Sequence, residues 1–148
     1  MKVKKFSPED LQTLSLQAEQ KFVGVNITDP DYANILMGSS VAYSLKNDDD
    51  ITLASAGLFE EDHGRAYAWA LISSDIGPSF IRLHKAIKNY LKTTRYRRIY
   101  MRVHTDFTAA ILWADRLGFD CVGIERQYLF GADFARFSYL PYFQKRGV

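Results

Sequence analysis

The chain has 148 residues, of which 47% are hydrophobic and 14% aromatic, and this predicts a single globular domain over residues 1–148 rather than a disordered segment. No stretch approaches the roughly 20 apolar residues that a bilayer crossing needs, and no apolar segment follows the basic N-terminus, so we expect a soluble, cytoplasmic protein without an export signal. The one cysteine, Cys121, excludes an internal disulfide, and the three scattered histidines argue against a metal site.

The net charge of +2 is too small to indicate a nucleic-acid partner, but its distribution is uneven. Eight basic residues and no acidic ones occur from Arg82 to Arg102. A solvated helix face with a basic loop explains this run better than a specific anion site does. Tyr90, Tyr96 and Tyr100 are interleaved with the basic residues, which leaves stacking on single-stranded nucleic acid as a weaker alternative.

The first half of the chain predicts a strand, a helix and a β-meander. We expect the strand over residues 1–6 and the helix over residues 7–22, because Ser7 is a typical N-cap. Residues 23–34 carry Gly, Asn, Asp and Pro and indicate a loop or a broken helix. Residues 39–73 contain three runs rich in β-branched and aromatic residues, separated by the turn-forming stretches "NDDD" and "EEDHG", and predict three antiparallel strands.

The second half alternates helices and strands. Apolar residues at helical spacing predict a helix from about Gly77 to residue 94, followed by a strand over residues 97–104. A second helix over residues 107–117 ends where Gly118 can take a left-handed conformation. Two further strands form a hairpin, over residues 120–130 and 134–140. Strand, helix and strand in this order imply parallel pairing beside the antiparallel meander, an α/β protein with a mixed sheet.

The stretch "RRIYMRVHTDFTAAILWADRLGFDCVGIERQY" resembles the GNAT superfamily of acyl-CoA-dependent N-acyltransferases, and the match covers about residues 64 to 128. The resemblance implies a central mixed sheet of six to seven strands flanked by about four helices, with two strands splayed apart near Ser73 and His104. It further implies acetyl-CoA or another acyl-CoA as cofactor and a small-molecule or protein amine as acceptor.

The stretches "DFTAAILWADRLGF" and "ERQYLFGADFARFSYL" are also similar to the divergent GNAT-like proteins of tailed bacteriophages. This narrower resemblance implies an alternative, in which the chain is a non-enzymatic virion or assembly protein in the host cytoplasm or the virion. Its partners would then be other phage structural proteins.

In the GNAT superfamily, the first splayed strand pairs with the pantetheine arm, and the amides that open the next helix hold the pyrophosphate. The resemblance carries this role to the residues of that strand, of the following turn and of the two nearby helices: Leu71, Ile72, Ser73, Gly77, Ser79, Phe80, Arg82 and Phe107. The loop departs from the family pattern, because Gly77 is its only glycine, Pro78 lacks an N–H, and Asp75 adds a negative charge.

The catalytic positions depart from the family as well. The Tyr that often protonates the leaving thiolate is matched by Ala114, and the Asn that opens the same helix is matched by Phe107. His104, at the end of a strand, and Glu60, in the preceding strand connection, are the candidate bases. Glu61 and His63 are further candidates in that connection, so whether the chain is an enzyme stays open at this point.

Overall fold

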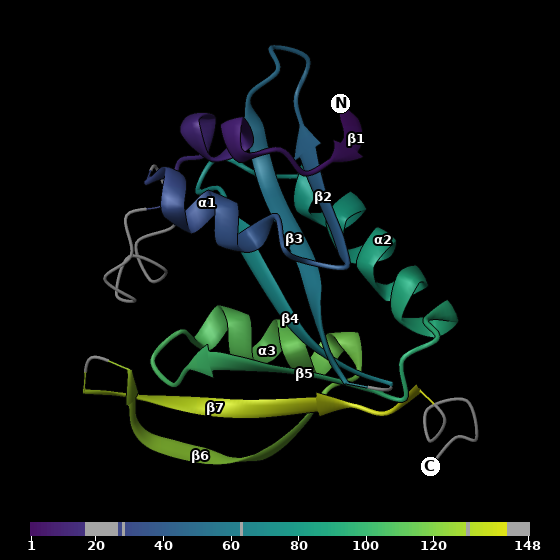
Figure 1. The fold of residues 1–148 in the computed structure, drawn as a ribbon, viewed down its shortest axis with the longest axis vertical. Coiled ribbons are helices and arrows are strands. Elements are labelled where there is room, and N and C mark those ends of the chain that lie inside the picture. Colours follow the sequence, from purple (N-terminus) through teal and green to yellow (C-terminus); the bar gives the residue numbers. More distant parts are fainter. Residues whose placement is uncertain (17–26, 28, 63, 130, 142–148) are drawn as a thin grey trace. The chain divides into compact units, whose positions relative to one another are not determined.

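The computed structural model describes residues 1–16, 27, 29–62, 64–129 and 131–141 (Figure 1). The strands in these residues are β1 (Lys2–Lys5), β2 (Val41–Lys46), β3 (Thr52–Asp62), β4 (Arg65–Ile72), β5 (Arg98–His104), β6 (Asp120–Leu129) and β7 (Ala132–Tyr139). The helices are the 3-10 helix η1 (Pro8–Thr13) and the α-helices α1 (Pro30–Leu36), α2 (Ser79–Thr93) and α3 (Thr108–Leu117).

The strands form one mixed sheet of seven strands in the order β1-β2-β3-β4-β5-β7-β6. The predicted meander of β2, β3 and β4 is confirmed by this order, and β4 pairs with β5 in parallel, as the intervening helix requires. One strand pairing differs from the expected parallel order of the second half. β7 lies between β5 and β6 and pairs antiparallel with both, so β5 and β6 are not neighbours.

The chain divides into two compact units, and β3 and β4 each have residues in both of them. The N-terminal unit comprises Met1–Phe59 and Ala68–Phe80, and the C-terminal unit comprises Glu60–Tyr67 and Ile81–Val148. Each unit is described by itself, and the expectation of a single domain over residues 1–148 stays a prediction.

The core of the N-terminal unit is built from η1, α1 and the strands beside them. Its buried members are Phe6, Leu11, Leu14, Leu16, Ile27, Ala33, Leu36 and Leu71. Trp69 packs edge-on against Phe6 at 5.6 Å between ring centroids, and its indole N–H donates to the Ser39 hydroxyl at 2.9 Å. A Cβ at Gly57 would lie 2.9 Å from that indole, so the sequence needs a glycine there.

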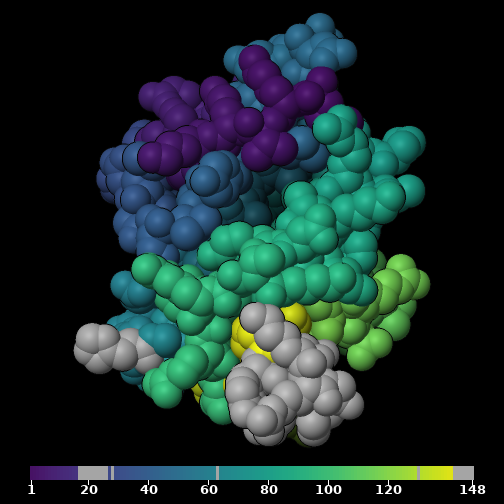
Figure 2. All heavy atoms as spheres, turned by 90° about the vertical axis from the view of Figure 1, so that its right-hand side faces the viewer, coloured from purple at the N-terminus to yellow at the C-terminus, as the bar shows by residue number. Residues whose placement is uncertain are grey.

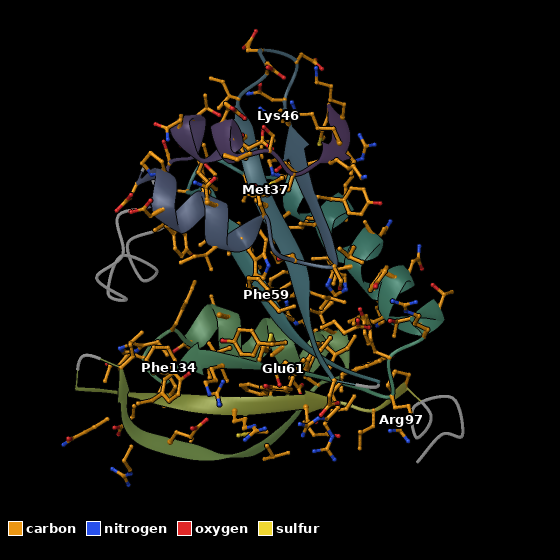
Figure 3. All side chains as sticks on the ribbon, viewed as in Figure 1. Met37, Lys46, Phe59, Glu61, Arg97 and Phe134 are labelled. Atoms are coloured by element: carbon orange, nitrogen blue, oxygen red, sulfur yellow. The ribbon has the colours of Figure 1, made fainter. Side chains whose placement is uncertain are left out.

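A buried polar group joins η1 to β2 in the same unit. The Asp10 carboxylate, 1% exposed, accepts from the Ser44 hydroxyl at 2.8 Å and from the Ser7 backbone N–H at 2.9 Å. The Lys46 ammonium, which extends from β2 (labelled in Figure 3), lies 3.0 Å from the same carboxylate. Because every buried charge here has a partner, the group is compatible with a core.

Two predictions for the first half were wrong, and a third left two alternatives open. The helix expected over residues 7–22 is a 3-10 helix ending at Thr13, after which Leu14 is extended; its continuation beyond residue 16 lies outside the described residues. The segment expected as a loop or a broken helix contains the start of α1, in agreement with the second alternative, and Asp29 caps this helix by accepting from the Asp31 N–H at 3.0 Å. Finally, β3 extends through the acidic residues 60–62, which were assigned to a turn.

Apart from the place of β7 in the sheet, the C-terminal unit confirms the helices and strands predicted for the second half of the chain. β5 has the expected extent, and α3 ends at Gly118 with φ 101°, a left-handed C-cap. The basic side chains of α2 are exposed, so the predicted solvated face is confirmed, and Figure 2 shows this helix at the surface. Side chains from β5, α3 and β7 form the buried side of the unit, among them Ile99, Val103, Ala114, Leu117, Ala135 and Phe137.

Within the described residues, no helix is long and apolar enough to span a membrane. The same part of the chain contains no group of three His, Cys, Asp or Glu side chains that could hold a metal ion.

Candidate functional site

The end of β4, where the resemblance places the pantetheine arm, is buried and already paired within the N-terminal unit. Leu71, Ile72 and Ser73 are 7%, 8% and 2% exposed. The Ser73 N–H donates to the Leu53 carbonyl of β3 at 2.8 Å. Successive N–H groups of a strand point to opposite edges, and the Ser74 N–H donates to the Ser15 carbonyl at 2.8 Å.

Residue 16 completes this pairing, since Leu16 forms an antiparallel bridge with Ser73. In the sheet order β4 lies between β3 and β5, so the edge away from β3 is the one that a parallel neighbour uses. At Ser73 and Ser74 the chain's own segment of residues 15–16 therefore takes the backbone groups that a pantetheine arm would need.

The turn from β4 into α2 also bonds to itself. The Asp75 N–H donates to the Ser73 hydroxyl at 3.0 Å, the Ser79 N–H to the Ile76 carbonyl at 3.1 Å, and the Phe80 N–H to the Gly77 carbonyl at 3.1 Å. Gly77 has φ 51°, a left-handed conformation that glycine adopts without strain. Among residues 75–80, all of them described, the Gly77 N–H is the one amide for which no acceptor occurs, apart from Pro78, which has no N–H.

The remaining cofactor candidates, Arg82 and Phe107, belong to the C-terminal unit. Arg82 is exposed on α2, one turn after Ser79. Phe107 is the N-cap residue of α3 and caps it with no side-chain hydrogen bond. Ala114, at the position of the family's tyrosine, is 0% exposed, so a larger side chain at this position would displace its neighbours.

His104 ends β5 and is held by a local contact. Its Nδ1 accepts a hydrogen bond from the Asp106 N–H at 3.0 Å, and its ring packs edge-on against Phe134 at 5.4 Å between ring centroids. An imidazole that accepts at Nδ1 and is neutral carries its proton on Nε2. In this tautomer, Nε2 is a donor, and a base at this position requires the contact with Asp106 to open.

Glu60 lies near the end of β3 and pairs with Arg95 at 3.5 Å. Both side chains are well exposed, at 48% and 79%, so this is a weak surface ion pair. His63, the neighbouring candidate, lies outside the described residues.

The candidate residues fall into two groups. Those of the cofactor loop lie in the N-terminal unit: Leu71, Ile72, Ser73, Gly77, Ser79 and Phe80. Glu60, Arg82, His104 and Phe107 lie in the C-terminal unit. The splayed strands near Ser73 and His104 would span both groups and stay a prediction.

Sequence reasoning missed a cluster on the open face of the C-terminal unit, which we call the arginine–aromatic face: Tyr67, Tyr100, Arg102, Glu125, Tyr128 and Arg136. The Arg102 guanidinium carbon lies 4.5 Å from the ring centroid of Tyr128 and 5.7 Å from those of Tyr67 and Tyr100. Its Nε donates to the Glu125 carboxylate at 2.8 Å. Three ring contacts and one charged hydrogen bond hold this side chain in one orientation.

The two inner tyrosines of this face stay protonated near neutral pH. Burial first, and then the hydrogen bond with the Glu61 carboxylate and the negative charge of that group, raise the pKa of Tyr100 to about 12. Burial also raises the pKa of Tyr67. Glu61 and Phe134, labelled in Figure 3, come from β3 and β7. Strand alternation on β5 could have predicted that Tyr100 and Arg102 share a face, but not which strands they meet.

Solved structures of N-acetyltransferases are similar to this chain over almost its whole length. A chimera of spermidine N-acetyltransferase from Vibrio cholerae and hSSAT matches with a TM-score of 0.71 and 14% identity, covering 99% of both chains. An acetyltransferase of the GNAT family from Bacillus anthracis matches with a TM-score of 0.69 and 11% identity, covering 95% of this chain and 94% of that one.

A putative phosphinothricin N-acetyltransferase matches with a TM-score of 0.74 and 11% identity, covering 94% of this chain and 97% of that chain. No family model and no curated protein sequence matches. The chain therefore has the fold of GNAT acetyltransferases, which confirms the predicted fold class.

Proposed function

We propose that the protein is an acyl-CoA-dependent N-acyltransferase with a reduced cofactor loop, acting on an amine. The observation that carries this proposal is the likeness to N-acetyltransferases over 94% to 99% of the chain. In this chain a turn and α2 follow β4, and α3 follows β5. Because one fold hosts many functions, the proposal depends on the site and must be tested there.

The residues fit acyl-CoA in a reduced form. The Gly77 N–H is the donor that the loop leaves for the pyrophosphate, and the start of α2 adds the positive end of a helix dipole. Arg82, one turn into α2, stays a further candidate donor. The Asp75 carboxylate opposes them. To pair with β4, a pantetheine arm has to displace the Ser15 carbonyl from the Ser74 N–H. We therefore expect weak binding.

For the transfer itself, bound acyl-CoA supplies the activated thioester. The chain supplies the base that takes the proton from the attacking amine, and His104 and Glu60 are our candidates for that role. Each has to give up a contact first, His104 with the Asp106 N–H and Glu60 with Arg95. With Ala114 in the tyrosine position, the leaving thiolate takes its proton from solvent or from the acceptor.

The test combines binding and turnover. Acetyl-CoA should raise the melting temperature and give saturable heat in calorimetry, and free thiol should appear when a panel of amines is added. His104→Ala should reduce turnover without affecting acetyl-CoA binding, and Arg82→Ala should weaken binding. Lys85→Ala, which removes another exposed charge of α2, is the matched control. Absence of both a melting shift and heat at millimolar acetyl-CoA contradicts the proposal.

The second candidate is a non-enzymatic protein that uses the same scaffold to bind other proteins, such as phage structural proteins in a virion. The observation that favours it is the self-bonded loop at Ser73–Phe80, together with the apolar residues Phe107 and Ala114 in the polar positions of the family. Co-purification with assembled particles and no amine acetylation is the expected result. Turnover of an amine, with the protein absent from purified particles, rejects it.

A further inference from the structure

The C-terminal unit contains an open pocket of about 330 Å³ that the acyl-transfer proposal does not use. Its lining comes from the first residues of β5 and β6, the second half of β7 and the residue that follows β7: Arg98, Asp120, Val122, Arg136, Ser138 and Leu140. Arg98 begins β5 and His104 ends it, so the pocket and the candidate base lie at opposite ends of this strand.

The lining of the pocket has two arginines and one carboxylate, so positive charge predominates. Neither Arg98 nor Arg136 forms an ion pair with any described residue, and Asp120, although it lines the same pocket, is paired with neither. Arg136 lies directly opposite Arg102 across β5 and β7, and Glu125 is already engaged by Arg102. Because like charges that lie opposite each other are unfavourable and Glu125 is engaged by Arg102, an anion in the pocket would offset the charge of Arg136.

Arg136 is also held in place before any ligand arrives. Its guanidinium carbon lies 4.7 Å from the centroid of the Tyr100 ring. Tyr100 is the direct neighbour of Ser138 in the β5–β7 pairing, so the ring, the guanidinium and the serine share one face of the sheet. A guanidinium that lies over an aromatic ring keeps the N–H groups at its own edge available for carboxylates and phosphates.

A buried hydroxyl group, that of Ser138, also indicates a ligand in this pocket. It is 6% exposed, and its Oγ is the one buried side-chain oxygen or nitrogen of the described residues without a hydrogen-bond partner. Native proteins rarely leave such a group unsatisfied, because a buried hydroxyl without a partner destabilises the fold. Since Ser138 lines the pocket, a ligand oxygen bound there is a natural acceptor for its hydroxyl.

We propose that this pocket binds the oxyanion group, a carboxylate or a phosphate, of a small molecule. Arg98 and Arg136 donate to the oxyanion, and the Ser138 hydroxyl completes its coordination. Asp120 accepts from an ammonium or hydroxyl group next to it, and Val122 and Leu140 contact the apolar part of the ligand. The site differs from the proposed acyl-CoA loop in every residue, so one can fail without the other.

The test uses two probes, inorganic phosphate and L-alanine, titrated into the ¹⁵N-labelled full chain at low ionic strength. Saturable shifts in the amides of β6 and β7 are expected with at least one of them, and the probe that shifts them identifies the oxyanion. Arg136→Ala and Arg98→Ala should each weaken binding at least tenfold. Arg116→Ala, which removes an exposed charge outside the pocket, should retain it. No saturable shift with either probe, or equal binding by Arg136→Ala, overturns the proposal.

Ser138→Ala separates a binding role from a structural one. Because the hydroxyl has no partner in the absence of ligand, its removal should leave the melting temperature unchanged or raise it, while weakening the probe several-fold. Ser55→Ala is the contrasting variant, since the Ser55 hydroxyl bonds to that of Ser44 and its loss should lower the melting temperature. If Ser138→Ala lowers the melting temperature and binds the probe as the unchanged protein does, the hydroxyl is structural and the proposed coordination is wrong.

Discussion

Arg102 and Arg136 lie directly opposite each other across β5 and β7, and their guanidinium groups both lie over the ring of Tyr100, at 5.7 and 4.7 Å. Two cations in this relationship repel each other unless their surroundings compensate. The Glu125 carboxylate, 2.8 Å from Arg102, is the acidic partner of the pair among the described residues. The stability of this face should therefore depend on Glu125.

We expect Glu125→Gln to lower the free energy of unfolding by about 1 kcal/mol, because the amide keeps the shape but loses the charge that offsets Arg102. Urea unfolding at low and high salt measures the effect, which should shrink at high salt as repulsion between the arginines is screened. Glu60→Gln is the matched control, since it removes the carboxylate of the more exposed pair with Arg95 and should change little. Equal effects of the two variants would contradict the role given to Glu125.

Tyr100 should make the protein sensitive to alkali. Its pKa in the folded state is about 12, against 10.0 for an ordinary tyrosine. Because the folded state holds this proton more tightly than the unfolded chain does, Tyr100 contributes its full stabilisation below about pH 10. That stabilisation is lost as the pH rises from about 10 to 12. This loss of stability amounts to at most about 3 kcal/mol. The free energy of unfolding, measured across this pH range, should fall less steeply for Tyr100→Phe than for the unchanged protein. Identical slopes would contradict the raised pKa of Tyr100.

The buried pair of Asp10 and Lys46 should matter more than any surface ion pair. Asp10→Asn leaves the Lys46 ammonium, 5% exposed, without its closest partner and should cost about 3 to 5 kcal/mol. Asp50→Asn, at the exposed partner of the same lysine, is the control and should have little effect. Chemical denaturation measures both, and a small cost for Asp10→Asn would mean that the group relaxes around the change.

Asp10 also predicts acid sensitivity. Burial opposes ionisation, but hydrogen bonds from the Ser7 N–H, Lys46 and Ser44 outweigh it and lower the pKa of Asp10 below 3.8. A carboxyl group whose pKa is lowered by folding stabilises the protein at pH values above the pKa that the group has in the unfolded chain. That stability is lost as the pH falls from about 3.8 toward the folded value. Asp10→Asn should therefore show a weaker decline in stability over this range than the unchanged protein.

The elements that the sequence predicts well are those with local signals. The extents of β5 and α3 follow from strand alternation, helical spacing and the left-handed position of Gly118, which depend on neighbours along the chain. η1 shows the opposite case. Its residues suit an α-helix, but Asp10 is drawn into the buried group with Lys46, and Leu16 joins the edge of β4. Tertiary contacts end the helix before local preference would.

The positions of some candidate residues in the fold also follow from local signals, while their roles in binding or catalysis stay predictions. Positions carried over by the resemblance, such as Gly77 and Phe107, do lie at the starts of α2 and α3. The arginine–aromatic face was not found, because β7 separates β5 from β6, and the opposition of Arg102 and Arg136 depends on that insertion. The pairing of Ser15 with Ser74 joins residues 59 positions apart, which no local pattern indicates.

The reduced cofactor loop leads to a charge test of the proposed function. Asp75 is exposed in the turn before α2, close in sequence to the Gly77 N–H. If the pyrophosphate of CoA binds at this turn, the Asp75 carboxylate repels it, and Asp75→Ala should raise CoA affinity about two- to threefold at low ionic strength. Calorimetry in dilute buffer measures the change, which should fade in high salt because exposed charges are screened beyond a few ångströms there.

Two comparisons make this result specific to the turn. Asp49→Ala removes an exposed carboxylate from the turn between β2 and β3 and should leave CoA affinity unchanged. Pantetheine, which lacks the pyrophosphate, should bind Asp75→Ala and the unchanged protein equally. An increase with both ligands would mean that the variant acts by loosening the bond between the Asp75 N–H and the Ser73 hydroxyl. No increase with CoA would place the pyrophosphate away from this turn and remove the main support for a reduced but working cofactor site.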